Sequence, residues 1–246
     1  MALDESPEYS VVIPVFNEAE SLPQLAAEVR RAMETLGHPY EVLFVDDGSA
    51  DGSWGVLKDI LDQDPHVRIL ALDKNCGQSA ALDAGFRSAR GRVVITLDAD
   101  LQNDPADIPL LVRELDRCDV ALGWRFRRQD SLIKRASSKV GNTVRNWVTD
   151  DDVLDSGCAL RAFRREAAER LKLFKGMHRF LPTLFKMEGF TVAQVQVSHR
   201  PRRHGKTKYG ILDRLAAALP DLLAVRWMQS RAARYKVREE ARGGGS

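Results

Sequence analysis

The first 123 residues alternate short apolar runs with longer helical patterns, and this alternation restricts the fold more than any other feature of the sequence. Five of the runs are nearly continuous in apolar residues, which indicates strands buried on both faces in a parallel sheet covered by helices. The predicted strands are 9–16, 41–47, 67–73, 93–100 and 119–124. Helices are predicted between them, at about 18–36, 52–63, 77–90 and 105–117. An open α/β sheet is therefore expected.

The pattern is less regular after residue 124. The remaining segments are predicted, in order, as a basic amphipathic helix at 130–148, a turn and short strand entering a helix at 155–171, a half-exposed strand at 190–200, a basic loop at 201–210 and a helix at 211–238. The sequence "GGGS" at 243–246 resembles a flexible linker and is left out of the predicted fold.

A chain of 246 residues with 44% hydrophobic side chains can bury the core of one large domain, or of two small ones at most. Its three cysteines, Cys76, Cys118 and Cys158, are odd in number and widely spaced, which fits neither a disulfide framework nor a Cys-x-x-Cys metal site. We expect ordinary buried thiols in a reducing cytoplasm. The acidic start of the chain and the absence of an 18-residue apolar run predict a cytoplasmic protein that spans no membrane.

The small net charge of +2 conceals a strong division along the chain. Residues 1–120 carry 10 Lys and Arg against 23 Asp and Glu, a net charge of −13, whereas residues 121–246 carry 27 against 12, a net charge of +15. The basic half is suited to phosphates or an anionic membrane surface. No zinc-finger spacing and no aromatic ribonucleoprotein motif is present, so we expect no nucleic-acid partner.

Polar residues gather where four of the predicted strands end, in "PVFNE", "VDDGSADGS", "LDKNCGQ" and "LDADLQ". Ligands of open α/β sheets bind beyond the carboxyl ends of the strands, so these clusters are expected to converge on one site. Asp98, Asp100 and Gln102 supply oxygen ligands two residues apart, as a hard cation such as Mg²⁺ or Mn²⁺ requires. Taken alone, the Asp-x-Asp pattern also fits solvated loop carboxylates, whereas its place at a strand end opposite a basic half favours the metal.

Two further stretches allow both a functional and a structural interpretation. "VDDGSADGS" can hydrogen-bond a ribose or a base edge, or it can form a surface turn. "PRRHGKTKYG" lacks Walker spacing but fits a mobile phosphate clamp, or else a solvated basic loop. The histidines His178, His199 and His204 lack metal-ligand spacing, and a structural or surface role is expected for each.

Seven motifs together resemble one family. "VVIPVFNE", "VDDGSADGS", "NCGQSAALDAGF", "LDADLQNDP", "GWRFRRQDS", "DSGCALRAFRRE" and "RRHGKTKYG" have the order and spacing of the inverting family 2 glycosyltransferases. Within that family, the chain is similar to the polyprenyl-phosphate group, which includes dolichyl-phosphate mannose synthases and undecaprenyl-phosphate aminoarabinose transferases. The resemblance covers about residues 9–225 and implies a GT-A fold, an open and mostly parallel sheet flanked by helices, with a C-terminal amphipathic helix.

The resemblance also assigns roles to residues. The nucleotide is expected at Pro14, Val15, Glu18, Asp46, Asp47, Asn75 and Gln78. Mg²⁺ or Mn²⁺ is expected at Asp98, Asp100 and Gln102, and the candidate catalytic residues are Asp155, Asp98 and Arg125. The acceptor and its phosphate are expected at Arg125, Lys134, Arg135, Ser138, Arg202, Arg203 and Lys208. The last motif usually reads Gly-x-Ser-Lys, and here Thr207 preserves the hydroxyl.

The implied reaction transfers one sugar from a GDP- or UDP-sugar to a polyprenyl phosphate, undecaprenyl or dolichyl, with inversion. The acceptor phosphate is already anionic near pH 7, so a strong general base is not required. Asp155 then either orients a sugar hydroxyl or assists as a base. A family 2 enzyme that acts on a saccharide or a protein is the alternative function, and a non-catalytic protein that binds nucleotide sugars is a third.

In domain terms, residues 1–210 are expected to form the GT-A domain, with a nucleotide-sugar half at 1–123 and an acceptor half at 124–210. The helix at 211–238 is expected to contact an anionic membrane peripherally from the cytoplasmic side. Alternatively, it packs on the domain or, in a homo-oligomer, on a second subunit.

Overall fold

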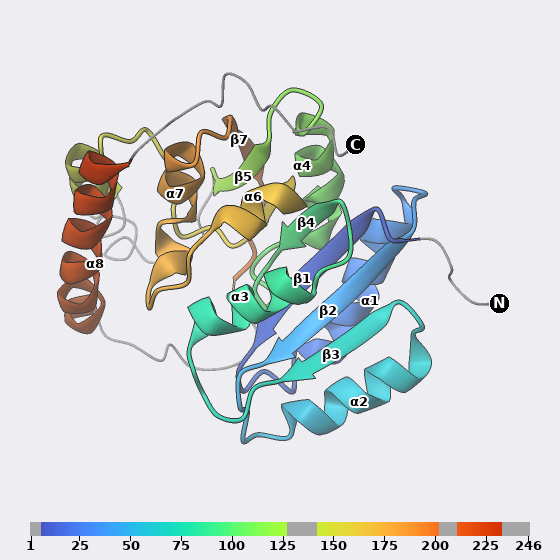
Figure 1. The fold of residues 1–246 in the computed structure, drawn as a ribbon. Coiled ribbons are helices and arrows are strands. Elements are labelled where there is room, and N and C mark those ends of the chain that lie inside the picture. The colour runs from blue at the N-terminus through green and yellow to red at the C-terminus, as the bar shows by residue number, and fades with distance from the viewer. Residues whose placement is uncertain (1–5, 127–141, 202–210, 233–246) are drawn as a thin grey trace, which may run out of the picture.

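The structure, a computed structural model, describes residues 6–126, 142–201 and 211–232, with side chains omitted for 211–218. The strands of the described residues form one sheet in the order β3-β2-β1-β4-β6-β5-β7 (Figure 1). Their bounds are β1 Tyr9–Val15, β2 Tyr40–Asp46, β3 Val67–Ala71, β4 Val93–Thr96, β5 Val120–Arg125, β6 Arg161–Arg164 and β7 Val192–Val197.

The direction of the strands decides where the site lies. β1 pairs in parallel with β2 and with β4, β2 pairs in parallel with β3, and β5 pairs in parallel with β7. β6 runs antiparallel to both of its neighbours, β4 and β5. β4 and β5 therefore point the same way, and the carboxyl ends of β1, β2, β4 and β5 all lie at one edge of the sheet. The predicted open and mostly parallel sheet is confirmed.

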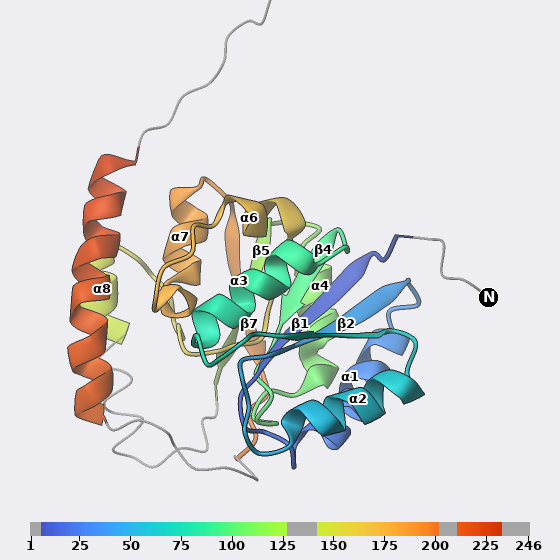
Figure 2. The same ribbon diagram turned by 60° about the horizontal axis from the view of Figure 1, so that its bottom comes forward.

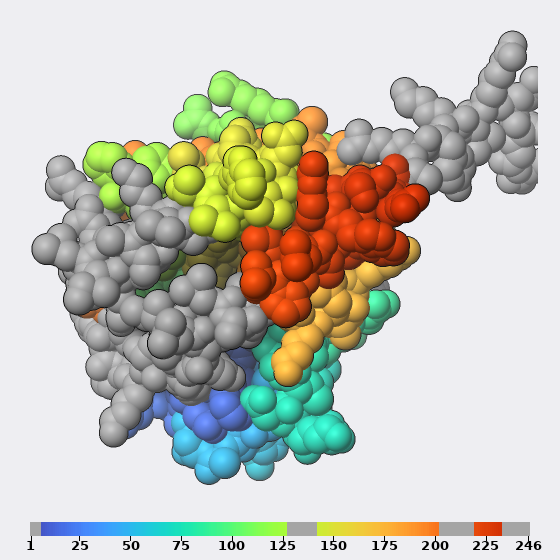
Figure 3. Space-filling view, turned by 90° about the vertical axis from the view of Figure 1, so that its left-hand side faces the viewer, coloured from blue at the N-terminus to red at the C-terminus, as the bar shows by residue number. Residues whose placement is uncertain are grey.

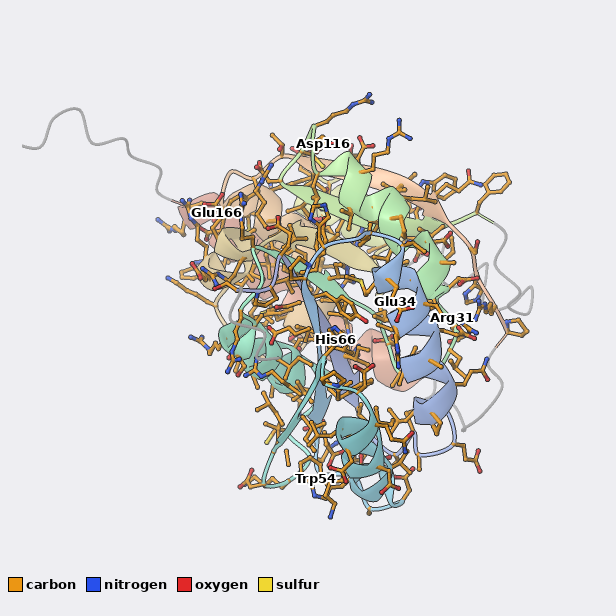
Figure 4. The ribbon with its side chains drawn as sticks, turned by 90° about the vertical axis from the view of Figure 1, so that its right-hand side faces the viewer. Arg31, Glu34, Trp54, His66, Asp116 and Glu166 are labelled. Atoms are coloured by element: carbon orange, nitrogen blue, oxygen red, sulfur yellow. The ribbon has the colours of Figure 1, made fainter. Side chains whose placement is uncertain are left out.

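Helices cover both faces of this sheet (Figures 1 and 2). The helices that pack on one face are α1 Leu22–Glu34, α2 Ser53–Gln63 and α4 Ile108–Glu114, the last preceded by the short 3-10 helix η1 Pro105–Asp107. Those on the other face are α3 Gln78–Ser88, α6 Arg165–Arg170, the 3-10 helix η2 Met177–Arg179, α7 Leu181–Met187 and α8 Ile211–Arg231. In Figure 4, Arg31 of α1 and Glu166 of α6 mark the two opposite sides.

The apolar runs become central strands because they supply side chains to both faces. In β1, Val11 and Ile13 are fully buried against one helical layer, and Val12 is fully buried against the other. Burying a Val or Ile side chain contributes roughly 1.5–3 kcal/mol, so a strand that buries both faces belongs in the middle of the sheet. β3 differs from the prediction: it lies at the edge of the sheet, and most of its side chains remain partly exposed.

Several elements were predicted to be longer than they are in the structure. β4 ends at Thr96 rather than at residue 100, because the chain turns through Asp98 and Asp100. α1 begins at Leu22 rather than near residue 18, since the preceding residues form a turn. Of the helix predicted at 130–148, only 142–148 lies in the described part; residues 142–149 are helical.

From residue 219 on, α8 has a buried side and an exposed side. Leu222 and Val225 are buried in the core, whereas Leu219, Leu223 and Trp227 are exposed. The helix therefore packs on the domain, as one of the two sequence-based alternatives proposed, while keeping an apolar outer side. The 142–149 helix lies beside it, and Gln229 Nε2 of α8 donates a 2.7 Å hydrogen bond to the Thr149 carbonyl (Figure 3).

Two predictions from composition can be compared with the structure. In the part of the chain that the structure describes, we find no helix that combines the length and the apolar character needed to cross a bilayer. Cys118 and Cys158 are buried thiols, as expected. Cys76 is exposed, so the prediction was wrong for this residue, which lies in the loop before α3 and not in a core element.

Candidate active site

The loops after β1 and β2 are joined at the predicted nucleotide end of the sheet. The amide of Asp47 donates to the Val15 carbonyl at 2.8 Å, and the amide of Glu18 donates to Ser53 Oγ at 3.0 Å. Asn17, which adopts a positive φ of 55°, accepts at Oδ1 a 2.8 Å hydrogen bond from the amide of Ala50. The structure thus places Val15, Glu18 and Asp47 together with Pro14, which lies in β1.

Asp47 organises the loop that leads into α3. Its carboxylate accepts hydrogen bonds from the amide of Cys76 at 2.7 Å, the amide of Gly77 at 2.9 Å and Asn75 Nδ2 at 3.0 Å. Burial raises the pKa of Asp47, and the two backbone hydrogen bonds oppose that rise. The carboxylate was predicted to bind nucleotide, and in the structure it holds the loop in place, as does its partner Asn75.

Asp46 differs from Asp47, because one of its carboxylate oxygens accepts no hydrogen bond from the described residues. The side chain is buried, and Oδ2 accepts a 3.3 Å hydrogen bond from the amide of Ser49. Within the described residues, no donor reaches the buried Oδ1 atom. A buried acceptor without a partner is costly, so the N–H or O–H of a bound ligand would stabilise this position.

The turn after β4 carries the predicted metal ligands. Leu101 is buried and has a positive φ of 62°, a conformation that costs a non-glycine residue energy and that the surrounding core must impose. Asp100 Oδ1 accepts a 3.1 Å hydrogen bond from the amide of Gln102, and Asp98 Oδ1 accepts one of 2.7 Å from Gln78 Nε2. Gln78 therefore orients Asp98, in addition to its predicted place near the nucleotide.

These residues fit a divalent cation held partly by substrate. Among the described residues, no group of three or more His, Cys, Asp and Glu side chains is arranged as a complete metal site. Mg²⁺ usually takes only one or two carboxylates from the protein, while phosphate oxygens and water complete its coordination. Asp98, Asp100 and Gln102 offer two carboxylates and one amide oxygen in one turn, which matches that pattern.

Arg125 and Asp155 form a buried ion pair at the end of β5. Arg125 Nε donates to Asp155 Oδ2 at 2.6 Å, and Arg125 Nη2 donates to Asp155 Oδ1 at 2.9 Å. Little of either side chain is exposed. The two candidate catalytic residues from the second half of the chain thus form a bidentate ion pair. This geometry fixes the planes of the guanidinium and the carboxylate.

The turn that carries Asp155 is held from three elements. Gln194 of β7 accepts from the amide of Leu154 at 2.7 Å and donates to the Asp152 carbonyl at 3.1 Å. Asn142 and Asn146, from the 142–149 helix, each donate a 3.0 Å hydrogen bond to a carbonyl of this turn. Lys186 of α7 forms ion pairs with Asp151 and Asp152. Nothing in the spacing of the sequence indicated these contacts.

The acidic residues after the metal turn have structural roles. Asp104 Oδ1 caps η1 by accepting a 3.0 Å hydrogen bond from the amide of Ala106, and its Oδ2 pairs with Arg200 at 2.6 Å. Asp107 accepts a 2.6 Å hydrogen bond from the amide of Ser198. Among the predicted phosphate ligands, six lie outside the described residues: Lys134, Arg135, Ser138, Arg202, Arg203 and Lys208.

Three further residues near the site were not among the predicted site residues, although a structural or surface role was expected for His178. Arg161 and Ser79 lie within motifs that the resemblance used, whereas His178 lies in none. Ser79 Oγ and His178 Nδ1 lie 2.8 Å apart although 99 positions separate them in the chain. Only the motifs could have drawn attention to Ser79 and Arg161. Nothing local could have indicated that Ser79 meets His178, because a contact across such a separation leaves no local pattern.

The fold is shared with known sugar-transferring enzymes. A structure of glucosyl-3-phosphoglycerate synthase from Mycobacterium tuberculosis, in complex with Mn²⁺, UDP and glucosyl-3-phosphoglycerate, matches 93% of this chain and 81% of its own with a TM-score of 0.69 and 17% identity. Another structure of that enzyme contains Mg²⁺ and UDP. The likeness confirms the predicted GT-A fold.

Sequence comparison gives nearer relatives. Dodecaprenyl-phosphate galacturonate synthase of Rhizobium johnstonii is 38% identical over 240 residues, which cover 95% of this chain and 70% of that protein. Undecaprenyl-phosphate 4-deoxy-4-formamido-L-arabinose transferase of Salmonella paratyphi B is 40% identical over 216 residues, which cover 87% of this chain and 66% of that protein. The chain thus spans about two thirds of the length of these relatives.

The family model for glycosyl transferase family 2 matches residues 10–172, the segment that runs from β1 past β6 and includes Asp46, Asp98, Asp100, Arg125 and Asp155. Because this match covers more than half of the chain and agrees with both the fold and the relatives, the protein belongs to glycosyl transferase family 2.

Proposed function

We propose that the protein transfers a single sugar from a nucleotide sugar to a polyprenyl phosphate, with a divalent metal and with inversion of the anomeric carbon. The arrangement of charges at the carboxyl ends of the strands carries this proposal. Asp46, Asp98 and Asp100 lie at the ends of β2 and β4, and the Arg125–Asp155 pair lies at the end of β5 on the same edge of the sheet. Relatives that act on polyprenyl phosphates support the choice of acceptor.

The nucleotide end of this site can hold a GDP- or UDP-sugar. The buried Oδ1 of Asp46 offers an acceptor for a ribose hydroxyl or a base N–H, and Pro14, Val15 and Glu18 lie in or just after the neighbouring strand β1. The hydrogen bonds that join the loops after β1 and β2 hold these groups in place. Such preorganisation lowers the entropy lost on binding.

Asp98, Asp100 and Gln102 would hold Mg²⁺ or Mn²⁺ beside the diphosphate. The metal would supply positive charge where the leaving diphosphate becomes more anionic. The chain's own residues prepare this position: the core holds Leu101 in the strained conformation of the turn, and Gln78 orients the Asp98 carboxylate.

Arg125 is our candidate for the acceptor phosphate, and Asp155 holds its guanidinium in a fixed plane. A phosphate monoester is largely dianionic at pH 7 and can attack the sugar carbon without a strong base. In-line attack inverts that carbon, and the leaving diphosphate takes the bonding electrons. We propose that Asp155 positions Arg125 and a sugar hydroxyl, and does not remove a proton. The six phosphate ligands expected outside the described residues belong to the same proposal.

We further propose that the protein contacts the cytoplasmic face of an anionic membrane peripherally. On their outer sides, α8 exposes Leu223 and Trp227, and the 142–149 helix exposes Val144 and Trp147. Exposed tryptophans are typical of the membrane–water interface. The expected nucleotide-sugar half, 1–123, and acceptor half, 124–210, would then meet the donor and the acceptor respectively.

The proposal is tested by incubating the protein with Mg²⁺ or Mn²⁺, labelled UDP- and GDP-sugars and undecaprenyl phosphate. We expect label from one donor to enter the organic phase as a monophosphate-linked sugar. Label on a saccharide or a protein acceptor alone would replace this function with the alternative one. Binding of nucleotide sugar without turnover on any acceptor would favour the non-catalytic alternative.

Asp100→Ala should abolish metal-dependent transfer, because it removes one of two carboxylates offered to the cation. Asp104→Asn is the matched control, since Asp104 lies in the same loop but caps η1 and pairs with Arg200. It should keep most of the activity. Wild-type rates for Asp100→Ala at limiting metal would show that the metal is held elsewhere.

A further inference from the structure

A chain of buried polar contacts lies behind the candidate site and connects its two ends. It begins at Ser79, the second residue of α3, which is buried. Ser79 Oγ lies 2.8 Å from His178 Nδ1 and accepts a 3.4 Å hydrogen bond from the His178 amide. Because the hydroxyl accepts from that amide, it can donate its own hydrogen to Nδ1. The start of α3 is thereby attached to η2.

Arg161 continues the chain of contacts on the other side of His178. Its Nη2 atom donates to the His178 carbonyl at 3.4 Å and to the Ser156 carbonyl at 3.2 Å. Arg161 lies in β6, where it pairs with Thr96 of β4 and with Leu122 of β5. Its side chain therefore joins η2 and the turn next to Asp155 to the centre of the sheet.

Both ends of these contacts are adjacent to candidate site residues. Ser79 follows Gln78, whose side chain holds Asp98, and Ser156 follows Asp155, which holds Arg125. We propose that Ser79, His178 and Arg161 act as an internal brace that fixes the distance and orientation between Asp98, at the metal end, and Asp155, at the acceptor end. This inference rests on the proposed function, because it assigns positioning residues to that reaction.

The charges of the brace favour a positioning role over simple packing. Burial lowers the pKa of Arg161, whereas Cys158, Asp98 and Asp155 oppose that change. Burial lowers the pKa of His178 to about 3, with Arg179 and Arg161 adding repulsion. A neutral ring keeps Nδ1 free to accept from Ser79. Apolar residues would fill such a space at a lower desolvation cost.

The brace is expected to affect metal binding more than nucleotide binding. Loss of the Ser79–His178 contact detaches the start of α3 from η2 and loosens Gln78 and the orientation of Asp98, while Asp47 still holds the loop before α3. Asp46 and the joined loops after β1 and β2 do not depend on this contact. Residues that orient a metal ligand typically alter metal affinity by 10- to 100-fold when removed.

The experiment measures Mn²⁺ affinity by calorimetry on the protein saturated with UDP or GDP, whichever it binds. Ser79→Ala and His178→Leu should each weaken Mn²⁺ binding about tenfold. The double variant should be no weaker than the single variants, because both remove the same contact. His178→Asn should retain near wild-type affinity, since its Oδ1 can accept from Ser79 in place of Nδ1. Nucleotide affinity in EDTA should change less than about twofold.

His66→Leu is the matched control, because this histidine, labelled in Figure 4, contacts Asp64 and Tyr40 just before β3, at the amino ends of the parallel strands. It should lower the melting temperature without weakening Mn²⁺ binding. Arg161→Lys, which keeps the charge but not the forked geometry, should lower kcat several-fold at saturating donor with little change in KM.

Two results would overturn the brace: unchanged Mn²⁺ affinity in both Ser79→Ala and His178→Leu, or a loss in His66→Leu as large as theirs. Failure of the proposed function looks different. If the wild type binds nucleotide and Mn²⁺ and the variants weaken the metal as expected, but no polyprenyl phosphate is glycosylated, the brace stands and the acceptor assignment fails.

Discussion

Single residues determine how closely the loops of the candidate site can approach one another. Gly48 follows Asp47 and has a φ of +68°. A Cβ at this position would lie 2.6 Å from the Asn75 amide nitrogen and 2.6 Å from the Lys74 carbonyl carbon, both backbone atoms. The backbone of the loop after β2 can therefore approach the backbone of the loop before α3 only because residue 48 has no side chain. The Asp47 hydrogen bonds depend on that close approach.

Gly48→Ala should destabilise the protein by about 3 kcal/mol or more, because strain and a backbone clash coincide there. Gly52→Ala is the matched control, since Gly52 has a φ of +90° but a Cβ there would meet nothing within 4 Å. It should cost about 1 kcal/mol, from the backbone conformation alone. Urea unfolding of both variants measures the difference, and equal costs would contradict the close approach.

His178 should make stability depend on pH in a specific direction. Its pKa in the folded protein is lowered to about 3 by burial, with added repulsion from Arg179 and Arg161, whereas an unfolded histidine titrates near 6.5. Between these values the unfolded chain binds the proton and the folded chain does not. Stability is therefore present above the unfolded pKa and is lost as the pH falls.

From pH 7 to pH 5 this loss should reach about 2 kcal/mol for the wild type relative to His178→Asn. Chemical unfolding of both proteins at several pH values measures it. Using the difference between the two proteins removes the contribution of groups that titrate in both. A difference that does not change with pH would show that the folded protein protonates His178 normally.

At the scale of elements, the turn that carries Asp155 depends on strand β7. This strand lies at the edge of the sheet, remote from the site in sequence, yet Gln194 holds the turn through both atoms of its amide. The candidate position of Asp155 is thus held by an element that contributes no predicted site residue. Side-chain amides that bond two backbone groups in this way replace the hydrogen bonds of regular structure.

Gln194→Ala should therefore lower kcat several-fold and speed hydrogen exchange at the Leu154 amide, while the sheet remains intact. Gln196→Ala is the matched control, because Gln196 lies on the same strand two residues further on and is exposed. It should leave both measurements unchanged. Slow exchange at Leu154 in Gln194→Ala would show that the other contacts hold the turn by themselves.

At the scale of the whole molecule, α8 and the 142–149 helix lie side by side at the surface (Figure 3), and both expose apolar side chains. Trp147 is 83% exposed and Trp227 is 63% exposed. The inner sides of the same elements hold the core through Leu222 and Val225 and hold the Asp155 turn through Asn142 and Asn146. A membrane bound at this surface would therefore lie close to the proposed acceptor position.

Replacing Trp147 and Trp227 together with Ser should lower sedimentation with phosphatidylglycerol-rich vesicles at least tenfold, because two interfacial anchors are removed. Activity on a short, water-soluble prenyl phosphate should change little. Leu110→Ser is the control, as Leu110 is an exposed apolar residue of α4 on the other face of the sheet. Unchanged vesicle binding in the double variant would remove this surface from the proposal.

Much of the nucleotide end of the site follows from local patterns. Apolar runs that end in Asp46 or lead into Asp98 and Asp100 predict both the strands and the edge at which these residues meet, because parallel strands share their direction. Pattern alone could not set the limits of β4, since the strand ends at Thr96 and the chain then turns through Asp98 and Asp100. Nor could it distinguish the central strands from β3, because position at an edge depends on pairing partners.

The amino-acid sequence by itself determined the α/β class, the family and the residues of the acidic cluster, because each depends on the local order of side chains. Tertiary structure alone decided that Arg125 pairs with Asp155, that Gln194 holds the turn and that Ser79 meets His178. These contacts join residues that are 30 to 99 positions apart in the chain. Strand β6 pairs antiparallel with both β4 and β5, and it thereby brings β5 and the Arg125–Asp155 pair to the edge of the sheet where Asp98 and Asp100 lie. No local pattern records such a contact, because its energy is realised only when the whole sheet has formed.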